Sequence, residues 1–221
     1  MLLVRLPGVF RPRSDSWLLA AVLRRQPQLR GGAVLDVCTG SGAVAISAAR
    51  AGARSVTAVD RSVLATLAVR VNARLNGVRV EALRGSLLTP VAGRRFDVIV
   101  ANPPYLPAAA DAVPAAGPAR HTEAGVSGRM LLDRLIDAAP GYLVPGGVLL
   151  VTHSSVNGEA ATLERMRSRG LEPAVAERRR GPLGPLLAAR APELEAKGLL
   201  EPGVRSEDLL VVAGSAPAQP R

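Results

Sequence analysis

Asn102-Pro103-Pro104-Tyr105 is the most specific chemical signal in the sequence, and it directly follows the apolar run 96–101. Two consecutive prolines have no N–H donor and a fixed φ, so the backbone carbonyls of Asn102 and Pro103 are held stiffly and remain free to accept hydrogen bonds. With the Asn102 side-chain carbonyl they converge on one NH₂ group, while the Tyr105 ring can pack against a planar amide or base. The motif predicts an acceptor site for a planar NH₂ nitrogen. A loop stiffener after the strand is the alternative.

Gly40 and Gly42 form a second signal, because they follow the apolar run 33–37 and precede a helical segment. A strand–glycine–helix turn lets the backbone approach a ligand and places a helix N-terminus beside it. Asp60 comes twenty residues after Gly40, at the end of the next predicted strand, where it can accept hydrogen bonds from two ribose hydroxyls. The pattern predicts a nucleoside cofactor; a sharp turn with a helix-capping Asp is the alternative.

Two cofactors fit this turn, since Gly40-x-Gly42-x-x-Ala45 also satisfies the dinucleotide fingerprint of NAD. Asp36, four residues before Gly40, helps to separate them. Its carboxylate would repel a pyrophosphate but suits the α-ammonium and sulfonium of S-adenosylmethionine. The sequence therefore favours S-adenosylmethionine, with NAD as a rival. A structural role for Asp36, in which it accepts hydrogen bonds from the N–H groups of the turn, stays open as well.

The composition restricts the partners. The formal net charge is +10, but every basic residue except Lys197 is Arg, so a general compositional bias explains the charge as well as a nucleic-acid partner does. One Trp, two Tyr and two Phe leave few platforms for stacking bases. We interpret Arg178-Arg179-Arg180 as a solvated surface run that could still touch RNA, and His121 and His153 as incidental.

A single cysteine, Cys38, excludes an intrachain disulfide and a cysteine-cluster zinc site, and we expect no metal. The longest apolar runs, such as residues 148–151, are far shorter than the ~18 residues of a membrane span. Residues 1–10 lack a cleavage pattern, so no signal peptide is expected. These features predict a soluble, cytoplasmic protein without membrane contact.

The elements that must position these residues alternate between strand and helix. The sequence predicts strands at 33–37, 55–60, 78–83, 96–101, 147–152 and 208–212, and helices at 43–50, 62–76 and 130–139. In the helix at 62–76, the three-to-four spacing of Val63, Leu64, Leu67, Val71 and Leu75 indicates an amphipathic face. Strands joined by helical crossovers predict an α/β fold with a doubly wound, mostly parallel sheet.

We expect three parts in the chain. Residues 1–30 form an N-terminal extension whose one helix, at 14–25, packs on the core; residues 31–213 form the main domain; and residues 214–221 are a disordered tail. The segment 106–126, rich in Ala, Pro and Gly, is predicted to be a loop beside the strand ends, and 180–205 an insertion before the last strand.

Over about residues 9–170 the chain resembles the class I S-adenosylmethionine methyltransferases, and within them the HemK-type protein-glutamine N5-methyltransferases. The resemblance lies in the stretch 9–19, in 34–42, in Asp60 and in 96–105. It implies a seven-stranded Rossmann-like fold, S-adenosylmethionine as cofactor, and methylation of a glutamine amide, most often in the Gly-Gly-Gln loop of a peptide chain release factor. By the resemblance, the cofactor site is lined by Ser16, Asp36, Cys38, Thr39, Gly40, Ser41, Gly42, Asp60, Arg61, Ser86, Leu87 and Asn102, and the amide is oriented by Asn102, Pro103, Pro104 and Tyr105.

The chain departs from the family at several points. Cys38 stands where many relatives have glycine, and we interpret it as a small buried residue and not a nucleophile. Ser86 stands where an acidic residue is usual, which predicts a weaker contact to the adenine amino group. The chain is similar to the short branch without a helical N-terminal domain, in which some members work with a small zinc-binding activator subunit. Gly128-Arg129 and Asp133 match a downstream segment of that branch.

Three other functions remain open at this point. Adenine N6 and guanine N2 present the same planar NH₂, so RNA or DNA amino-group methylation is the main alternative. A protein that binds the cofactor without acting, and an NAD-dependent reductase, are the others.

Overall fold

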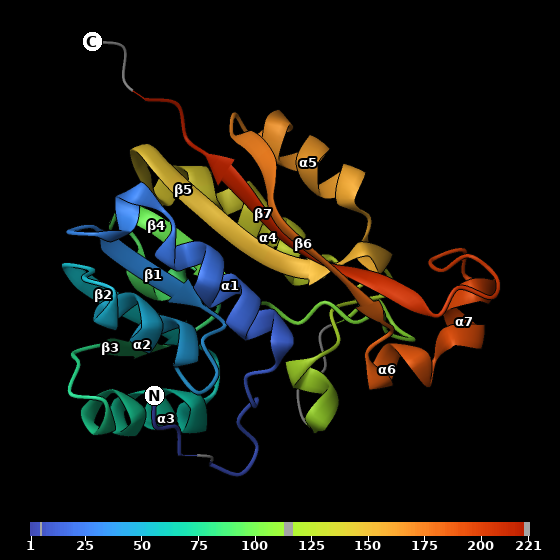
Figure 1. The fold of residues 1–221 in the computed structure, drawn as a ribbon, viewed down its shortest axis with the longest axis horizontal. Coiled ribbons are helices and arrows are strands. Elements are labelled where there is room, and N and C mark those ends of the chain that lie inside the picture. Colours follow the sequence, from blue (N-terminus) through green and yellow to red (C-terminus); the bar gives the residue numbers. More distant parts are fainter. Residues whose placement is uncertain (5, 113–116, 219–221) are drawn as a thin grey trace.

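The computed structural model describes residues 1–4, 6–112 and 117–218 (Figure 1). One seven-stranded sheet runs through the molecule in the order β3-β2-β1-β4-β5-β7-β6, and β7 is antiparallel to both of its neighbours. The strands are β1 Ala33–Val37, β2 Ser55–Asp60, β3 Glu81–Arg84, β4 Phe96–Ala101, β5 Leu143–Ser154, β6 Glu172–Pro182 and β7 Ser206–Ser215. The doubly wound, mostly parallel α/β class is confirmed.

Helices cover both faces of this sheet (Figure 1). They are α1 Ser14–Arg24, α2 Ala43–Arg50, α3 Val63–Leu75, α4 Met130–Ala138, α5 Glu159–Ser168, α6 Pro185–Ala188 and α7 Ala191–Ala196. None of the helices in the described residues is both long and apolar enough to cross a membrane.

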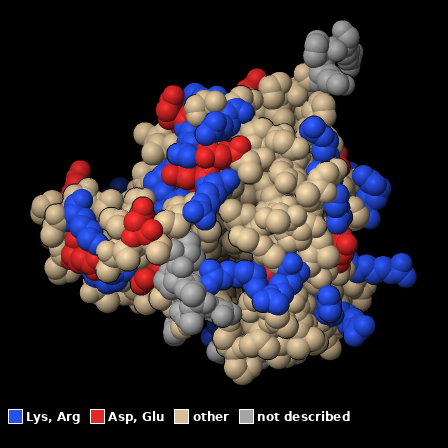
Figure 2. Space-filling view, turned by 180° about the vertical axis from the view of Figure 1, so that it is seen from behind, with Lys and Arg blue, Asp and Glu red and all other residues tan. Residues whose placement is uncertain are grey.

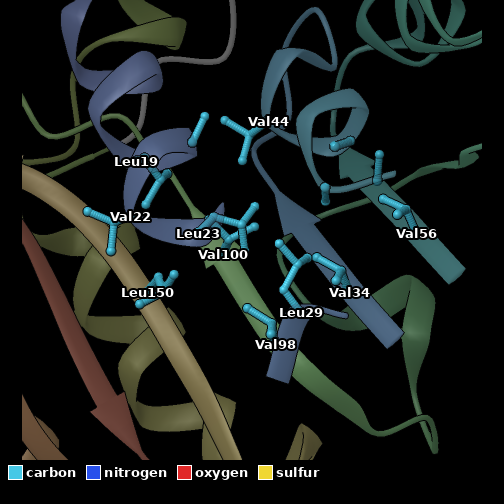
Figure 3. Packing of buried hydrophobic residues seen from close by; sticks show 14 of the residues in the cluster. Leu19, Val22, Leu23, Leu29, Val34, Val44, Val56, Val98, Val100 and Leu150 are labelled. Carbon is cyan, nitrogen blue, oxygen red and sulfur yellow. The ribbon is translucent and has the colours of Figure 1, made fainter. Parts of the chain in front are cut away.

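The core has two layers because successive side chains of a strand point to opposite faces of the sheet. Val98, Val100 and Leu150 pack with α1 and α2 on one face, as Figure 3 shows. Ile99 and Leu149 pack with α4 on the other face. Near-continuous apolar strands such as β4 therefore indicate a sheet that is buried on both sides.

The N-terminal residues lie along this body. Leu19, Val22 and Leu23 of α1 belong to the core that α2 and the sheet share. Before α1, the backbone of Val4 forms hydrogen bonds with the side chain of Asn72 in α3, and the backbone of Leu2 with the side chain of Asn76, which caps the C-terminus of α3.

The helix α3 forms where it was predicted, but it packs with the face opposite to the expected one. Small residues such as Ala65 and Ala68 are buried with Val69, whereas the large apolar residues point outward. The approach to the glycine turn is close, since a Cβ on Gly42 would lie 3.1 Å from Cγ2 of Val69. The exposed residues are Val63, Leu64, Leu67 and Leu75.

The sequence prediction failed at the far edge of the sheet. Strand β6 was not predicted, since its residues are mostly exposed or half-buried, three of them are consecutive arginines, and prolines lie near both ends. Such a composition is typical of an edge strand and lacks the apolar alternation that predicts a strand. The segment expected as an insertion starts inside β6 and continues through α6 and α7, which pack together around Leu187 and Leu194.

Two further boundaries differ from the prediction. Strand β7 extends to Ser215, so Gly214 and Ser215 belong to the sheet and not to the expected tail; residues 219–221 lie outside the described part of the chain. The expected loop 106–126 contains a short 3₁₀ helix, Pro118–His121, and a bridge between Leu106 and Glu123, while residues 113–116 again lie outside the described part.

Candidate active site

A cavity of about 670 Å³ lies at the carboxyl ends of β1, β2 and β4. The strand order reverses at β1, and this switch point is where doubly wound sheets bind their ligands. Val9 and Phe10 line the cavity from the N-terminal side, and Leu183 and Leu187 line it from the α6 side. Figure 2 shows the corresponding face hollowed between the projecting α6–α7 lobe and the main body, with Lys and Arg side chains at the border of the hollow.

The structure brings nearly all predicted site residues to this place. The cavity is lined by Cys38, Gly40, Asp60, Arg61, Ser86, Leu87, Asn102, Pro103, Pro104 and Tyr105. A smaller hollow shares Cys38 and Asn102 with the cavity and is also lined by Ser16, Asp36, Thr39 and Ser41. Gly42 lines neither; it takes a φ of 83° at the start of α2, where it permits the close approach of Val69.

Asp36 is buried and tied into the glycine turn. Its Oδ2 accepts hydrogen bonds from Thr39 Oγ1 at 2.6 Å and from the backbone N of Ala45 at 3.0 Å. These bonds are the structural role that the sequence left open for this carboxylate. Burial nevertheless raises the pKa of Asp36 from 3.8 to about 7, and the charge of Asp60 adds to the rise. A cation in the adjoining cavity would stabilise the ionised form of this carboxyl.

Asp60 braces the same turn from β2. Its Oδ2 accepts from the backbone N of Gly40 at 3.0 Å, and its Oδ1 accepts from the backbone N of Ser62 at 2.9 Å. Each carboxylate oxygen keeps a second lone pair, and the half-buried side chain lines the cavity. The arrangement leaves Asp60 able to accept hydrogen bonds from a pair of ligand hydroxyls.

Cys38 and Leu87 share an unusual backbone conformation. They are the only non-glycine residues with positive φ in the described part of the chain, at 59° and 47° respectively, and both line the cavity. Left-handed φ values favour glycine, which fits the glycine that the family resemblance implies at the position of Cys38. Burial, with the charges of Asp60 and Asp36, raises the pKa of the Cys38 thiol, so it stays protonated and is unsuited to act as a nucleophile.

Asn102 follows β4 directly and lines the cavity. Its Nδ2 donates to Ser16 Oγ in α1 at 3.1 Å, across 86 residues of sequence. Tyr105 O–H donates to Oδ2 of Asp15, next to Ser16, at 3.2 Å. Burial, the charge of Asp15 and the charge of Glu207 raise the pKa of Tyr105, so its hydroxyl keeps its proton. The Asn-Pro-Pro-Tyr segment is thus attached to α1 at both of its ends.

A second support holds the same segment from the side of β5. Asn157 Nδ2 donates to the backbone O of Tyr105 at 2.6 Å, and Arg129 donates to the backbone O of Asn157 at 2.6 Å. Gly128 is required beside them, since its φ is 70° and a Cβ there would lie 2.2 Å from the Tyr105 carbonyl oxygen. Arg129 also bonds Asp133 at 2.7 Å. The downstream segment that resembles the family therefore has a local structural role.

Asp15 and Asn157 have no role that sequence patterns indicated. Asp15 lies inside the matched stretch 9–19, but nothing in the sequence places it beside Tyr105. Asn157 lies three residues after β5, with no motif around it comparable to Asn-Pro-Pro-Tyr.

The remaining charged residues divide between the cavity and the surface. Arg178 pairs with Glu159 and Asp208, whereas its neighbours Arg179 and Arg180 line the cavity, so only part of the arginine run fits the predicted surface role. His121 lines the cavity as well. His153 is buried within β5, where burial lowers its pKa to about 4.

No cluster of three or more His, Cys, Asp or Glu side chains suited to a metal ion occurs within residues 1–4, 6–112 and 117–218.

Comparison with known proteins identifies the family. The methyltransferase small domain family matches residues 1–169. A putative protein N5-glutamine methyltransferase of Methanocaldococcus jannaschii is 33% identical over 185 residues, covering 84% of this chain and 92% of that protein. A release factor glutamine methyltransferase of Geobacter sulfurreducens is 36% identical over 170 residues, covering 74% of this chain, which spans only 58% of that enzyme.

Among solved structures, the Mtq2–Trm112 complex of E. cuniculi, described as responsible for the methylation of the eRF1 translation termination factor, superposes with a TM-score of 0.66. The match covers 94% of this chain and 98% of that chain at 24% identity, so it supports the fold. The donor in this family is S-adenosylmethionine. The chain belongs to the methyltransferase small domain family and, within it, to the HemK-type glutamine methyltransferases.

Proposed function

We propose that this protein methylates the side-chain amide nitrogen of a glutamine, and that the glutamine lies in the Gly-Gly-Gln loop of a peptide chain release factor. The observation that supports this most is the hydrogen bond from Asn102 Nδ2 to Ser16 Oγ. It occupies the donor side of the Asn102 amide, so the acceptor oxygen remains for a substrate NH₂. The names of the archaeal and bacterial relatives support the choice of substrate.

The donor set of the cavity fits S-adenosylmethionine. Two carboxylates, Asp36 and Asp60, lie at the glycine turn, and the apolar Val59 and Leu87 line the same wall. Burial raises the pKa of the Asp36 carboxyl to about 7. An adjacent cation would stabilise its ionised form, whereas an adjacent pyrophosphate would repel it. We propose that Asp36 and the turn hold the amino-acid end of the donor, and that Asp60 accepts from its ribose.

The proposed chemistry needs positioning more than acid–base catalysis. When bound, S-adenosylmethionine supplies an electrophilic methyl group on its sulfonium. Asn102 Oδ1 and the Pro103 carbonyl would each accept one proton of the substrate NH₂, which draws the nitrogen from planar toward pyramidal and stabilises the positive charge that develops on it. Tyr105 would pack against the amide plane and fix the direction of the lone pair. The methylated nitrogen then loses its proton to water, because an N-alkylated amide cation is strongly acidic.

The decisive experiment compares acceptors directly. We expect methyl groups labelled with tritium to pass from S-adenosylmethionine into purified release factor, and not into release factor whose loop glutamine is replaced by alanine. Total RNA and DNA are assayed side by side with the same enzyme. Label in RNA or DNA with none in release factor would reject the proposed substrate while leaving the methyltransferase activity intact.

RNA or DNA amino-group methylation is the second candidate, and one observation favours it. Arg179 and Arg180 line the cavity and form no ion pair with any residue of the described part of the chain, so two cations are available to phosphates beside the acceptor end. The scarcity of aromatic residues argues against this candidate.

The activator subunit and the cytoplasmic location remain proposals. A small activator subunit is supported by the neighbour Trm112 complex and by the exposed Leu64 and Leu67 of α3, a surface that a partner would cover. The test is whether a Trm112-type subunit from the same organism raises the methylation rate of the isolated chain. A cytoplasmic location is proposed because release factors act on ribosomes.

A further inference from the structure

Asp15 is a buried carboxylate at the junction between α1 and the Asn-Pro-Pro-Tyr segment, and only 5% of its surface is exposed. Its Oδ1 accepts from the backbone N of Ser16 at 2.6 Å and from Ser16 Oγ at 3.3 Å, and its Oδ2 accepts from Tyr105 O–H at 3.2 Å. Among the residues that the structure describes, no Lys, Arg or His forms an ion pair with it. Burying a carboxylate without a cation beside it is costly, so stability alone does not account for Asp15 and a role in the site explains it better.

The chemistry of a carboxylate fixes the direction of every hydrogen bond in this group. Both carboxylate oxygens of Asp15 accept in this group, so the hydroxyls of Ser16 and Tyr105 both donate to Asp15. A hydroxyl has one proton, and once Ser16 has donated it, the Ser16 oxygen can only accept. The group facing Ser16 Oγ must then be the NH₂ of Asn102 and not its oxygen, which agrees with the bond from Asn102 Nδ2.

We propose that Asp15 is a positioning residue that sets the hydrogen-bond polarity of the acceptor site. It acts through Ser16 to hold the Asn102 amide with its oxygen toward the substrate, and it directly anchors the Tyr105 hydroxyl. The inference rests on the proposed function in one respect, namely that the substrate presents an NH₂ group.

This polarity has a consequence for specificity. A site that presents only oxygens binds a donor such as the NH₂ of glutamine and repels an acceptor such as the carboxylate of glutamate. Without the Asp15 side chain as acceptor, the Ser16 hydroxyl is free to donate to Asn102, and the amide can turn by 180° about its terminal bond and present its NH₂ to the substrate. Two NH₂ groups cannot bond to each other, so the turned state is unproductive.

The experiment begins with Asp15→Ala in the full chain, assayed with whichever acceptor the wild-type enzyme methylates, because asparagine would keep an amide oxygen that can still accept from Ser16. We expect kcat at saturating donor to fall by on the order of 10-fold, less than removal of the Asn102 amide itself. The dissociation constant for S-adenosylhomocysteine should stay within about twofold. Asp137→Ala is the matched control, because Asp137 binds Arg165 and Arg169 outside the cavity and the substitution removes the same carboxylate.

A double-mutant cycle separates this role from a general structural one. If Asp15 acts through Ser16, adding Asp15→Ala to Ser16→Ala should lower kcat by much less than it does in the wild type. Tyr105→Phe, which removes the other partner of Asp15, isolates the second arm in the same way. If the fold-losses in kcat of the two single substitutions simply multiply in both cycles, the proposal is overturned. Weakened donor binding with an unchanged kcat would overturn it as well.

A second measurement does not depend on any acceptor. Nuclear magnetic resonance of the ¹⁵N-labelled protein reports the side-chain NH₂ of Asn102, assigned by its absence from the Asn102→Ala spectrum. We expect its two proton signals to move and to exchange faster with water in Asp15→Ala, and to remain in place in Asp137→Ala. Unchanged Asn102 signals in Asp15→Ala would refute the positioning role, even if no glutamine substrate is methylated and the proposed function fails.

Discussion

The two ends of the cavity are built in different ways. At the donor end, Asp36 bonds Thr39 three residues away, and Asp60 bonds Gly40 twenty residues away. At the acceptor end, Asn102 is held by Ser16 from 86 residues away, and Tyr105 by Asp15 from 90 residues away. The donor end is therefore assembled by one strand–turn–helix unit and its neighbour, whereas the acceptor end exists only when α1 has docked on the sheet.

This difference separates binding from turnover. Side chains that brace the glycine turn should affect mainly the affinity for the donor. Side chains that hold the Asn-Pro-Pro-Tyr segment should affect mainly the rate at saturating donor. The predictions test whether donor affinity and turnover rate can be changed separately.

The largest effect is expected at the acceptor end. Asn102→Ala removes an acceptor that is held in place before the reaction, so we expect turnover to fall by on the order of 10²-fold while the affinity for S-adenosylhomocysteine changes less. Single-turnover rates and isothermal titration measure the two quantities. Loss of cofactor binding together with a normal rate at saturating cofactor would refute the assignment of Asn102.

At the donor end we expect a pH effect on affinity. Binding of a ligand ammonium requires ionised Asp36, and burial raises the pKa of this carboxyl to about 7 in the free protein. The affinity for S-adenosylhomocysteine should be constant above pH 7 and fall by up to about 10-fold for each pH unit below it, because protonation of one group opposes binding. Isothermal titration between pH 5.5 and 8 tests this. If the affinity of the wild-type protein does not change with pH, the ligand ammonium binds away from Asp36. The variant Asp36→Asn should bind S-adenosylhomocysteine weakly at every pH.

A smaller effect should follow from the second support of the acceptor end. Asn157→Ala removes the donor that holds the Tyr105 carbonyl, so we expect kcat to fall several-fold, with donor affinity unchanged and a stability loss of about 1–3 kcal/mol for the unpaired buried groups. Asn76→Ala is the matched control, because Asn76 donates to the backbone of Leu2 outside the cavity. Equal rate losses in the two variants would remove any special role for Asn157.

The remaining predicted effect concerns stability and not activity. The pKa of Asp36 is raised in the folded state, from 3.8 to about 7, so its contribution to stability is complete below pH 4 and is lost as the pH rises through about 7. Asp36→Asn does not titrate, and its amide oxygen can still accept from Thr39. The melting temperature of the variant relative to the wild type should therefore increase between pH 4 and 7, by several degrees, and level off above pH 7. Thermal scans of both proteins across this range provide the measurement; a constant difference would contradict the raised pKa.

The strands and helices of the donor half were predictable from local sequence. The helix α2 has the predicted limits, and β1, β2 and β4 lie where apolar runs predicted them, because these strands are buried on both faces. The failures have physical causes as well. Strand β6 is an exposed edge strand with three consecutive arginines, so it lacks the apolar alternation that predicts a strand. The helix α3 buries mainly small residues, although its apolar spacing predicted the opposite face.

The sequence by itself determined the fold class, the glycine turn with its two acids, and the stiff Asn-Pro-Pro-Tyr segment, because each depends on residues that are near one another in the chain. Only the tertiary structure decided which way the Asn102 amide faces. That choice depends on Ser16 and Asp15, which local patterns cannot place, since they reach Asn102 and Tyr105 only through the packing of α1 against the sheet. A buried carboxylate then fixes the direction of the hydrogen bonds, and with it what the acceptor site can recognise.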